Sequence, residues 1–232
     1  MFVLQVLSFC IWLPLEILIM AALLRGGWRR FPLIFLYILV DFLVTASEIR
    51  PALAYWRVVS SGVQGKAPIW WDTRLLLETA VYAAVISLIY GASAKLGPRR
   101  VMRLSVITGA VLFAGVSFLV HYSPSLPTRD WMTPWMRDVH FCSAVLDLIL
   151  WALLIRRPHL DRLLLLLSGG LGIKFAGEAI GESLRLIGFG SHSAPFQYAG
   201  SILFVLANWI FLYIWWQALR TATAQATRNL GA

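Results

Sequence analysis

Four charged residues recur along one apolar stretch of the sequence at intervals that an α-helix would align. Lys174, Glu178, Glu182 and Arg185 are spaced by four, four and three residues. At roughly 100° per residue they share one helical face, on which the two basic residues flank the two acids. Lys174 can then pair with Glu178, and Glu182 with Arg185. This stretch is predicted to be a helix with a charged column along one side.

Further ionisable or polar residues interrupt other apolar stretches. A charge at mid-bilayer costs roughly 2.5–3.5 kcal/mol, so these side chains should pair, titrate or line a wet cavity. From its depth, Lys174 is expected to pair with Asp147 or Asp41. A purely structural network of ion pairs is the alternative interpretation. The candidate residues for ligand binding or for a proton or ion pathway are Glu16, Asp41, Arg74, Glu78, Asp147, Lys174, Glu178, Glu182, Arg185 and Asn208.

No catalytic or metal-binding motif accompanies these charges. The sequence lacks the H-E-x-x-H pattern of zinc proteases and the G-x-S-x-G elbow of serine hydrolases. His121 and His140 could ligate haem or, with Met132 and Met136, a copper ion, but their spacing matches no known ligand signature. We therefore expect a protein that is not an enzyme and that has no metal and no cofactor.

Long apolar stretches are predicted to position the charged residues. Hydrophobic residues make up 59% of the 232 and charged residues only 13%. A helix of about 20 apolar residues crosses a bilayer, and backbone groups must be paired in lipid. The predicted fold is all-α: residues 1–232 form a single transmembrane domain, a polytopic bundle of about seven helices. The expected spans are 2–24, 31–49, 74–93, 101–121, 139–155, 163–187 and 196–217.

The basic residues indicate how these spans are oriented. Twelve of the twenty Lys and Arg fall on one side, in three connections and the C-terminal tail, and seven fall on the other. Cytoplasmic loops are enriched in Lys and Arg, so the N-terminus is predicted outside and the C-terminus in the cytoplasm. The net charge of +9 is thus a topology signal, and nucleic acid is not an expected partner. The expected location is the cell (cytoplasmic) membrane.

Tryptophans and prolines add detail at the expected membrane surfaces. The longer outer connections, 50–73 and 122–138, are predicted to be interfacial connectors, with lids over the bundle as the alternative. Indole rings favour the headgroup region, where the ring is half-buried and its N–H is wet. The tryptophans expected there are Trp28, Trp56, Trp70, Trp71, Trp131, Trp135, Trp215 and Trp216.

The first and fifth expected helices resemble one another. Residues 15–25 align without gaps to 146–156, and in each an acid, Glu16 or Asp147, lies nine residues before an arginine. Asp41 and Lys174 occupy similar positions in the second and sixth helices. This similarity suggests a 3+1+3 parallel repeat, as in small seven-helix sugar transporters, although leucine-rich helices also align by chance.

The chain resembles uncharacterised bacterial seven-helix membrane proteins. The resemblance lies in Arg30-Phe31-Pro32 at the start of the second span, in Asp41 within it and in the charged sixth helix. It implies the pattern of spans and carries no specific activity.

Three functions fit these features. The favoured one is small-solute or proton-linked transport, based on the charges within the membrane and the glycine-rich sixth helix. The alternatives are a ligand-binding, receptor-like sensor and a structural subunit of a larger membrane complex. The expected partners are the lipid bilayer, a small molecule or ion, and either other subunits or further copies of this chain.

Overall fold

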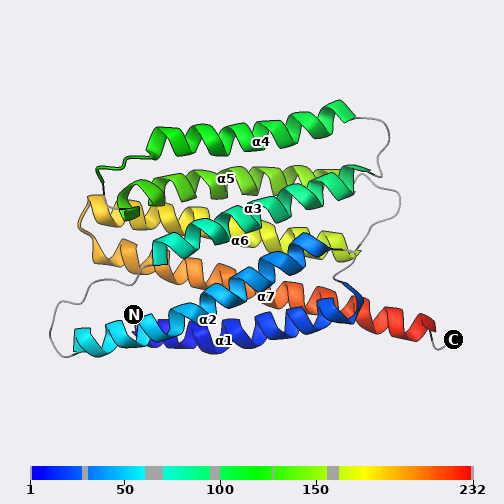
Figure 1. The fold of residues 1–232 in the computed structure, drawn as a ribbon, viewed down its shortest axis with the longest axis horizontal. Helices are drawn as coiled ribbons and strands as arrows, with labels where there is room; N and C mark the ends of the chain where they lie inside the picture. The colour runs from blue at the N-terminus through cyan, green and yellow to red at the C-terminus, as the bar shows by residue number, and fades with distance from the viewer. Residues whose placement is uncertain are drawn as a thin grey trace.

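The computed structural model describes residues 2–27, 31–60, 70–94, 100–126, 128–155 and 162–230. These residues form seven α-helices, a short π-helical segment and no strand, which confirms the all-α prediction (Figure 1). Successive helices run antiparallel, and the two termini lie at opposite ends of the molecule. The helices are α1 (Phe2–Ala22), α2 (Pro32–Ser60), α3 (Trp70–Ala94), α4 (Arg100–His121), α5 (Thr128–Ile155), α6 (Arg162–Gly190) and α7 (Ala194–Leu230), and the π-helical segment Leu23–Gly27 follows α1.

Five of the helices are long and apolar enough to cross a membrane. They contain the segments Val6–Arg25, Pro32–Arg50, Leu104–His121, Arg162–Gly190 and Ala194–Thr221. The apolar part of α3, Leu75–Ile89, is shorter. The sequence of α5 is interrupted by polar residues, including His140 and Asp147. The membrane character predicted from composition therefore rests on five of the seven helices.

Six helices are arranged in a ring, and the seventh lies outside it. Around the ring, each of α1, α2, α3, α5, α6 and α7 contacts the next, and α7 contacts α1 again. Helix α4 packs on α5 and only marginally on α3, at one edge of the molecule (Figure 1). Its outer face exposes large apolar side chains such as Leu104, Leu119 and Val120, as expected for a helix that faces lipid. The ring encloses the polar residues described below.

Helix α5 begins eleven residues before the predicted span, so most of the predicted connector 122–138 is helical. Pro134 lies inside this helix, where a proline removes one backbone hydrogen bond and crowds the preceding turn, so packing outweighs the local preference here. The apolar residues Met132, Trp135, Met136 and Val139 have helical spacing, and all four are buried. The prediction of a surface connector or lid is therefore wrong for residues 128–138.

The other predicted outer connection is also shorter than expected. Helix α2 continues through Pro51 to Ser60, and α3 begins at Trp70. Of the predicted connector 50–73, only residues 61–69 lie between the helices, and these are outside the described residues. Pro51 therefore does not end α2, which continues for nine residues beyond it.

Two tryptophans that were predicted at the membrane surface are buried between helices instead. The indole N–H of Trp215 donates to the carbonyl oxygen of Leu167 at 2.8 Å, and that of Trp135 donates to Ala114 at 3.3 Å. Because a main-chain oxygen satisfies the N–H, these rings do not need the wet headgroup region. The side chains of Trp28, Trp56, Trp70 and Trp71 lie outside the described part of the chain.

Helices α6 and α7 make the most extensive contact in the molecule, and glycines allow their close approach. A Cβ at Gly177 would collide with the Cβ of Ala207, and a Cβ at Gly181 would lie 2.8 Å from the carbonyl oxygen of Gly200. Gly177 and Gly181, four residues apart on one face of α6, therefore allow α7 to approach closely. This contact holds Lys174 and Glu178 against α7.

We expect Gly177→Ala to destabilise the protein by about 1–3 kcal/mol, because the new methyl group overpacks the α6–α7 contact. The measurement is thermal or denaturant unfolding in detergent. Gly115→Ala on α4 is the matched control, because a Cβ there meets nothing within 4 Å. Alanine favours helix over glycine by about 0.5–1 kcal/mol, so this control should be neutral or stabilising. Equal effects of the two substitutions would contradict the packing argument.

Candidate functional site

A cavity of about 100 Å³ lies inside the ring of helices. Its lining comes from α1, α2, α3, α6 and α7. Six of the ten candidate residues line it together: Glu16, Asp41, Glu78, Lys174, Glu178 and Asn208. All six residues were predicted within apolar helices, and the packing of the helices brings them together around one cavity.

Glu178 is the centre of this group. Its Oε1 atom accepts hydrogen bonds from Lys174 Nζ and, at 2.8 Å, from Asn208 Nδ2. Lys174 Nζ also donates to Asn208 Oδ1 at 2.8 Å, which closes a three-membered network across α6 and α7. The i,i+4 pairing of Lys174 with Glu178 that the sequence predicted is confirmed. Glu178 is 0% exposed and Lys174 is 5% exposed, so this network is buried.

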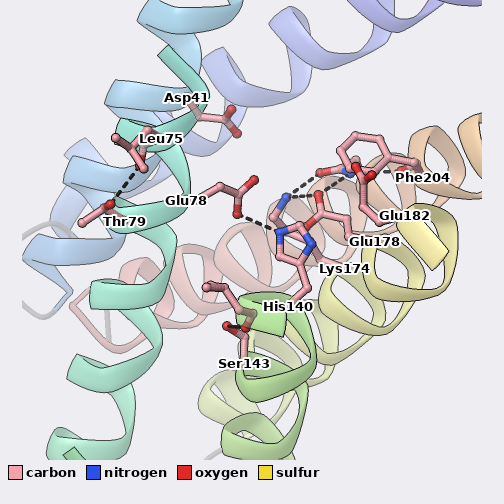
Figure 2. Close-up of polar contacts among 12 residues, drawn as sticks. Asp41, Leu75, Glu78, Thr79, His140, Ser143, Lys174, Glu178, Glu182 and Phe204 are labelled. Atoms are coloured by element: carbon pink, nitrogen blue, oxygen red, sulfur yellow. Dashed lines mark hydrogen bonds and ion pairs between the residues drawn. The ribbon is translucent and has the colours of Figure 1, made fainter. Parts of the chain in front are cut away.

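His140 joins α5 to the same group, as Figure 2 shows. Its Nε2 atom lies 2.7 Å from Glu78 Oε2 on α3 and 3.2 Å from Glu178 Oε2 on α6. The imidazole is 0% exposed and Glu78 is 3% exposed. A single ring nitrogen therefore faces two buried carboxylates that come from different helices.

Aromatic rings lie beside Lys174, on its α7 and α2 side. The ammonium group is 5.6 Å from the centroid of the Phe211 ring, close enough for a cation–π contact. Phe211 and Tyr37 pack with the buried Trp215, and the hydroxyl of Tyr37 donates to Asp41 Oδ2 at 3.3 Å. These rigid side chains fix both the lysine and the aspartate at the edge of the cavity.

The cavity has an excess of acid. Glu16 on α1 and Asp41 on α2 line it opposite the network on α6 and α7, and Oε2 of the buried Glu16 has no hydrogen-bond partner among the described residues. With Glu48, Glu78 and Glu178, five carboxyl groups line the cavity that also holds the ammonium of Lys174. Unbalanced negative charge is costly in an apolar bundle unless protons or cations neutralise it. The arrangement is therefore suited to binding positive charge.

Asp147 does not join this group, which excludes one of the two acids, Asp147 and Asp41, that were predicted as alternative partners of Lys174. Its Oδ1 atom accepts a hydrogen bond from Ser168 at 2.8 Å. A Cβ at Gly172 would lie 2.7 Å from Asp147 Oδ2, so the carboxylate rests against bare α6 backbone. Ser168 and Gly172 precede Lys174 in α6 by about one and a half turns and about half a turn, respectively. The similar depth of Asp147 and Lys174 in the membrane suggested that they would pair. Instead, Asp147 contacts Ser168, and Lys174 contacts Glu178 and Asn208.

Two further candidates form a separate pair, and one has no described side chain. Arg185 donates to Glu182 at 3.1 Å, as the spacing of three predicted. Neither residue lines the cavity, although Glu182 is buried. The side chain of Arg74 lies outside the described part of the structure.

The other histidine of the predicted ligand pair has a partner of its own. His121 Nε2 lies 2.9 Å from Asp138 Oδ2, which also accepts from Ser117 at 3.0 Å. Burial acts to raise the pKa of Asp138, but hydrogen bonds from His121, Arg137 and Ser117 outweigh it and hold that pKa below its usual value. His121 thus belongs to the α4–α5 contact, and it does not share a site with His140.

His140 is the central residue that the site prediction omitted. It was named from the sequence as a possible metal ligand with His121, but it was not among the ten candidate residues. The signal for its burial was present, since Met136, Ser143 and Asp147 stand at helical spacing from it and all are buried. Its partners Glu78 and Glu178 are far away in the sequence, so no local motif could have named them.

Comparison with known protein families, with curated proteins and with solved structures finds no match for this chain. What the protein does must therefore be argued from the cavity and its side chains.

Proposed function

We propose that this protein transports a small solute across the cell membrane, coupled to the movement of protons. The observation that carries the proposal is the cavity inside the ring, where five carboxyl groups and one ammonium meet beside a buried imidazole, all contributed by five helices. Ionisable groups within membrane helices typically mark pathways for substrates, ions or protons. A purely structural network would need fewer acids to balance Lys174.

The proposal includes seven spans, with α3 and α5 crossing the membrane inside the bundle. The charged and polar residues that lower their hydropathy, Glu78 on α3 and His140 and Asp147 on α5, are buried. Such helices can cross a membrane when their polar groups face protein and not lipid. An odd number of spans is consistent with termini at opposite ends of the molecule (Figure 1). The excess of Lys and Arg on one side favours a cytoplasmic C-terminus.

The order of helix contacts supports the 3+1+3 repeat as part of this proposal. Exchanging α1, α2 and α3 with α5, α6 and α7 leaves the set of neighbours around the ring unchanged. Helix α4 then connects the halves from outside the ring. Parallel repeats of this kind hold the substrate between the two halves, near the membrane midplane. Such a repeat would hold the substrate at the cavity, whose lining comes from α1, α2 and α3 and from α6 and α7.

The proposal predicts proton flux that depends on Glu178. Purified protein would be reconstituted into liposomes that contain a pH-sensitive dye, and ammonium, alkali-metal and Mn²⁺ salts would be added in turn. At least one of them should drive a pH change that empty liposomes lack. Glu178→Gln should reduce the rate by more than about 10-fold, because the amide cannot exchange a proton as the carboxylate can.

Asp147→Asn is the matched control for this experiment. It replaces another buried carboxylate with its amide, but Asp147 contacts Ser168 and lies outside the cavity. The control should retain wild-type flux. Equal loss in both variants would overturn the assignment of the pathway to the cavity. Binding of a solute without any flux would instead favour the receptor-like function.

A further inference from the structure

Three buried ligand atoms converge at the α3, α5 and α6 side of the cavity. One carboxylate oxygen of Glu78, one ring nitrogen of His140 and one carboxylate oxygen of Glu178 all lie within 4.8 Å of one another. We infer that these three side chains bind a divalent transition-metal cation. The inference deepens the proposed function and rests on it in one respect. If the protein transports a solute, that solute belongs to this class of cation.

The donor set matches this class of cation. Zn²⁺, Mn²⁺ and Fe²⁺ accept a mixture of imidazole nitrogen and carboxylate oxygen, whereas Mg²⁺ and Ca²⁺ prefer oxygen alone. His140 would bind through Nε2, since this atom faces both carboxylates at 2.7 and 3.2 Å. Around a zinc ion, ligand atoms lie about 2.0–2.2 Å from the metal and hence roughly 3.4 Å apart. For a metal ion to bind, the two contacts of His140 Nε2 with Glu78 and Glu178 would have to lengthen only slightly.

An unsatisfied oxygen provides a second, independent indication. Within the described part of the chain, Glu178 Oε2 accepts no hydrogen bond, although the side chain is completely buried. The imidazole Nε2 can carry only one hydrogen, and Glu78 is its nearer partner. A bound cation in place of that hydrogen would satisfy the nitrogen and both carboxylates at once. The Nδ1 atom of His140 has no partner among the described residues, so the ring is free to keep its hydrogen there.

The surroundings fit the exchange of a proton for a cation. The charged groups that line the cavity from other helices are Glu16 on α1 and Asp41 and Glu48 on α2, and on α6 itself Lys174 pairs with one carboxylate. The remaining acids can compensate a double positive charge. Because the ligand atoms must lose their protons, cation affinity should fall as the pH is lowered. Alternate binding of a cation and a proton at one site is the requirement for exchange transport.

The test is equilibrium binding of Zn²⁺ and Mn²⁺ to the full chain in detergent, without a polyhistidine tag, by competition with a chromophoric chelator. We expect one saturable site per chain with lower affinity at lower pH. His140→Gln should weaken binding by more than about 100-fold, because losing a direct ligand costs more than losing a supporting partner. His121→Gln is the matched control, because His121 is bound to Asp138, and it should leave the affinity unchanged.

A second variant guards against a simple folding defect. His140→Cys keeps a metal ligand at the same position, and with Co²⁺ it should give a thiolate-to-cobalt charge-transfer band that the wild type lacks. Absence of saturable binding, wild-type affinity in His140→Gln, or absence of the new band would each overturn the inference.

Uptake measurements separate this inference from the proposed function. Binding in detergent without Mn²⁺ uptake into proteoliposomes would overturn the cation as substrate and remove the support for transport. Proton-coupled flux of another solute, with no cation binding, would overturn the inference and leave the proposed function standing.

Discussion

Lys174→Met is expected to lower the free energy of unfolding by about 3–5 kcal/mol, the usual cost of removing one partner from a buried ion pair. Lys174 donates to both Glu178 and Asn208, and all three side chains are buried. Without the ammonium, the carboxylate of Glu178 keeps only the amide of Asn208 and the imidazole of His140 as partners. Reversible unfolding in mixed detergent micelles would measure the loss.

The double variant Lys174→Met/Glu178→Gln decides whether the ion pair is the cause. Removing both charges leaves a neutral amide that can still bond to Asn208, so most of the lost stability should return. If the effects of the two single substitutions simply add, the two residues are not energetically coupled and the network described here is not the source of stability. Recovered stability without recovered proton flux would separate the structural role of the pair from its role in transport.

Trp215→Ala is expected to have a similarly large effect, about 3–5 kcal/mol of lost stability, as for other large buried aromatics. Trp215 is 0% exposed, packs edge-on against Tyr37 and lies 4.6 Å from the ring of Phe211, measured between centroids. A Cβ at Gly170 would touch its ring, so the indole fills the space that this glycine leaves. The substitution would open a cavity at the junction of α2, α6 and α7.

Two further tryptophan variants separate packing from hydrogen bonding. Trp215→Phe keeps an aromatic ring but loses the hydrogen bond to Leu167, so its cost should be smaller than that of Trp215→Ala. Trp151→Ala is the surface control, because this side chain is substantially exposed on α5 and should change stability by less than about 0.5 kcal/mol. If Trp215→Ala were as mild as Trp151→Ala, the junction would not be the packed core that the contacts indicate.

The network around Glu178 suggests how the proposed transport would be linked to stability. Lys174 and Asn208 hold one oxygen of Glu178, while the other oxygen faces His140. One carboxylate thus connects the rigid α6–α7 contact to the α3–α5 side of the ring. A proton or cation that binds between Glu78, His140 and Glu178 would change the charge of that connection. We expect any movement between the two halves of the ring to depend on this residue.

The sequence by itself determined the helical elements, the alternation of their direction and the charged face of α6. It could do so because these features depend on local hydropathy and on the 3.6-residue period. Both pairs within α6, Lys174 with Glu178 and Glu182 with Arg185, are set by the spacing of residues on one helix. The close approach of another helix at Gly177 and Gly181 was predictable for the same reason.

Only the tertiary structure decided which charges from different helices meet. Asp147 and Asp41 looked equally suited to Lys174, yet Asp147 bonds to Ser168 and Asp41 lines the cavity. His140 became central only when α3, α5 and α6 packed together. Depth along a helix follows from residue number, but the direction in which a side chain points relative to its neighbours follows from how the helices rotate and pack. For this reason the sequence could name most of the site residues, and only the packed ring could show that they surround one cavity.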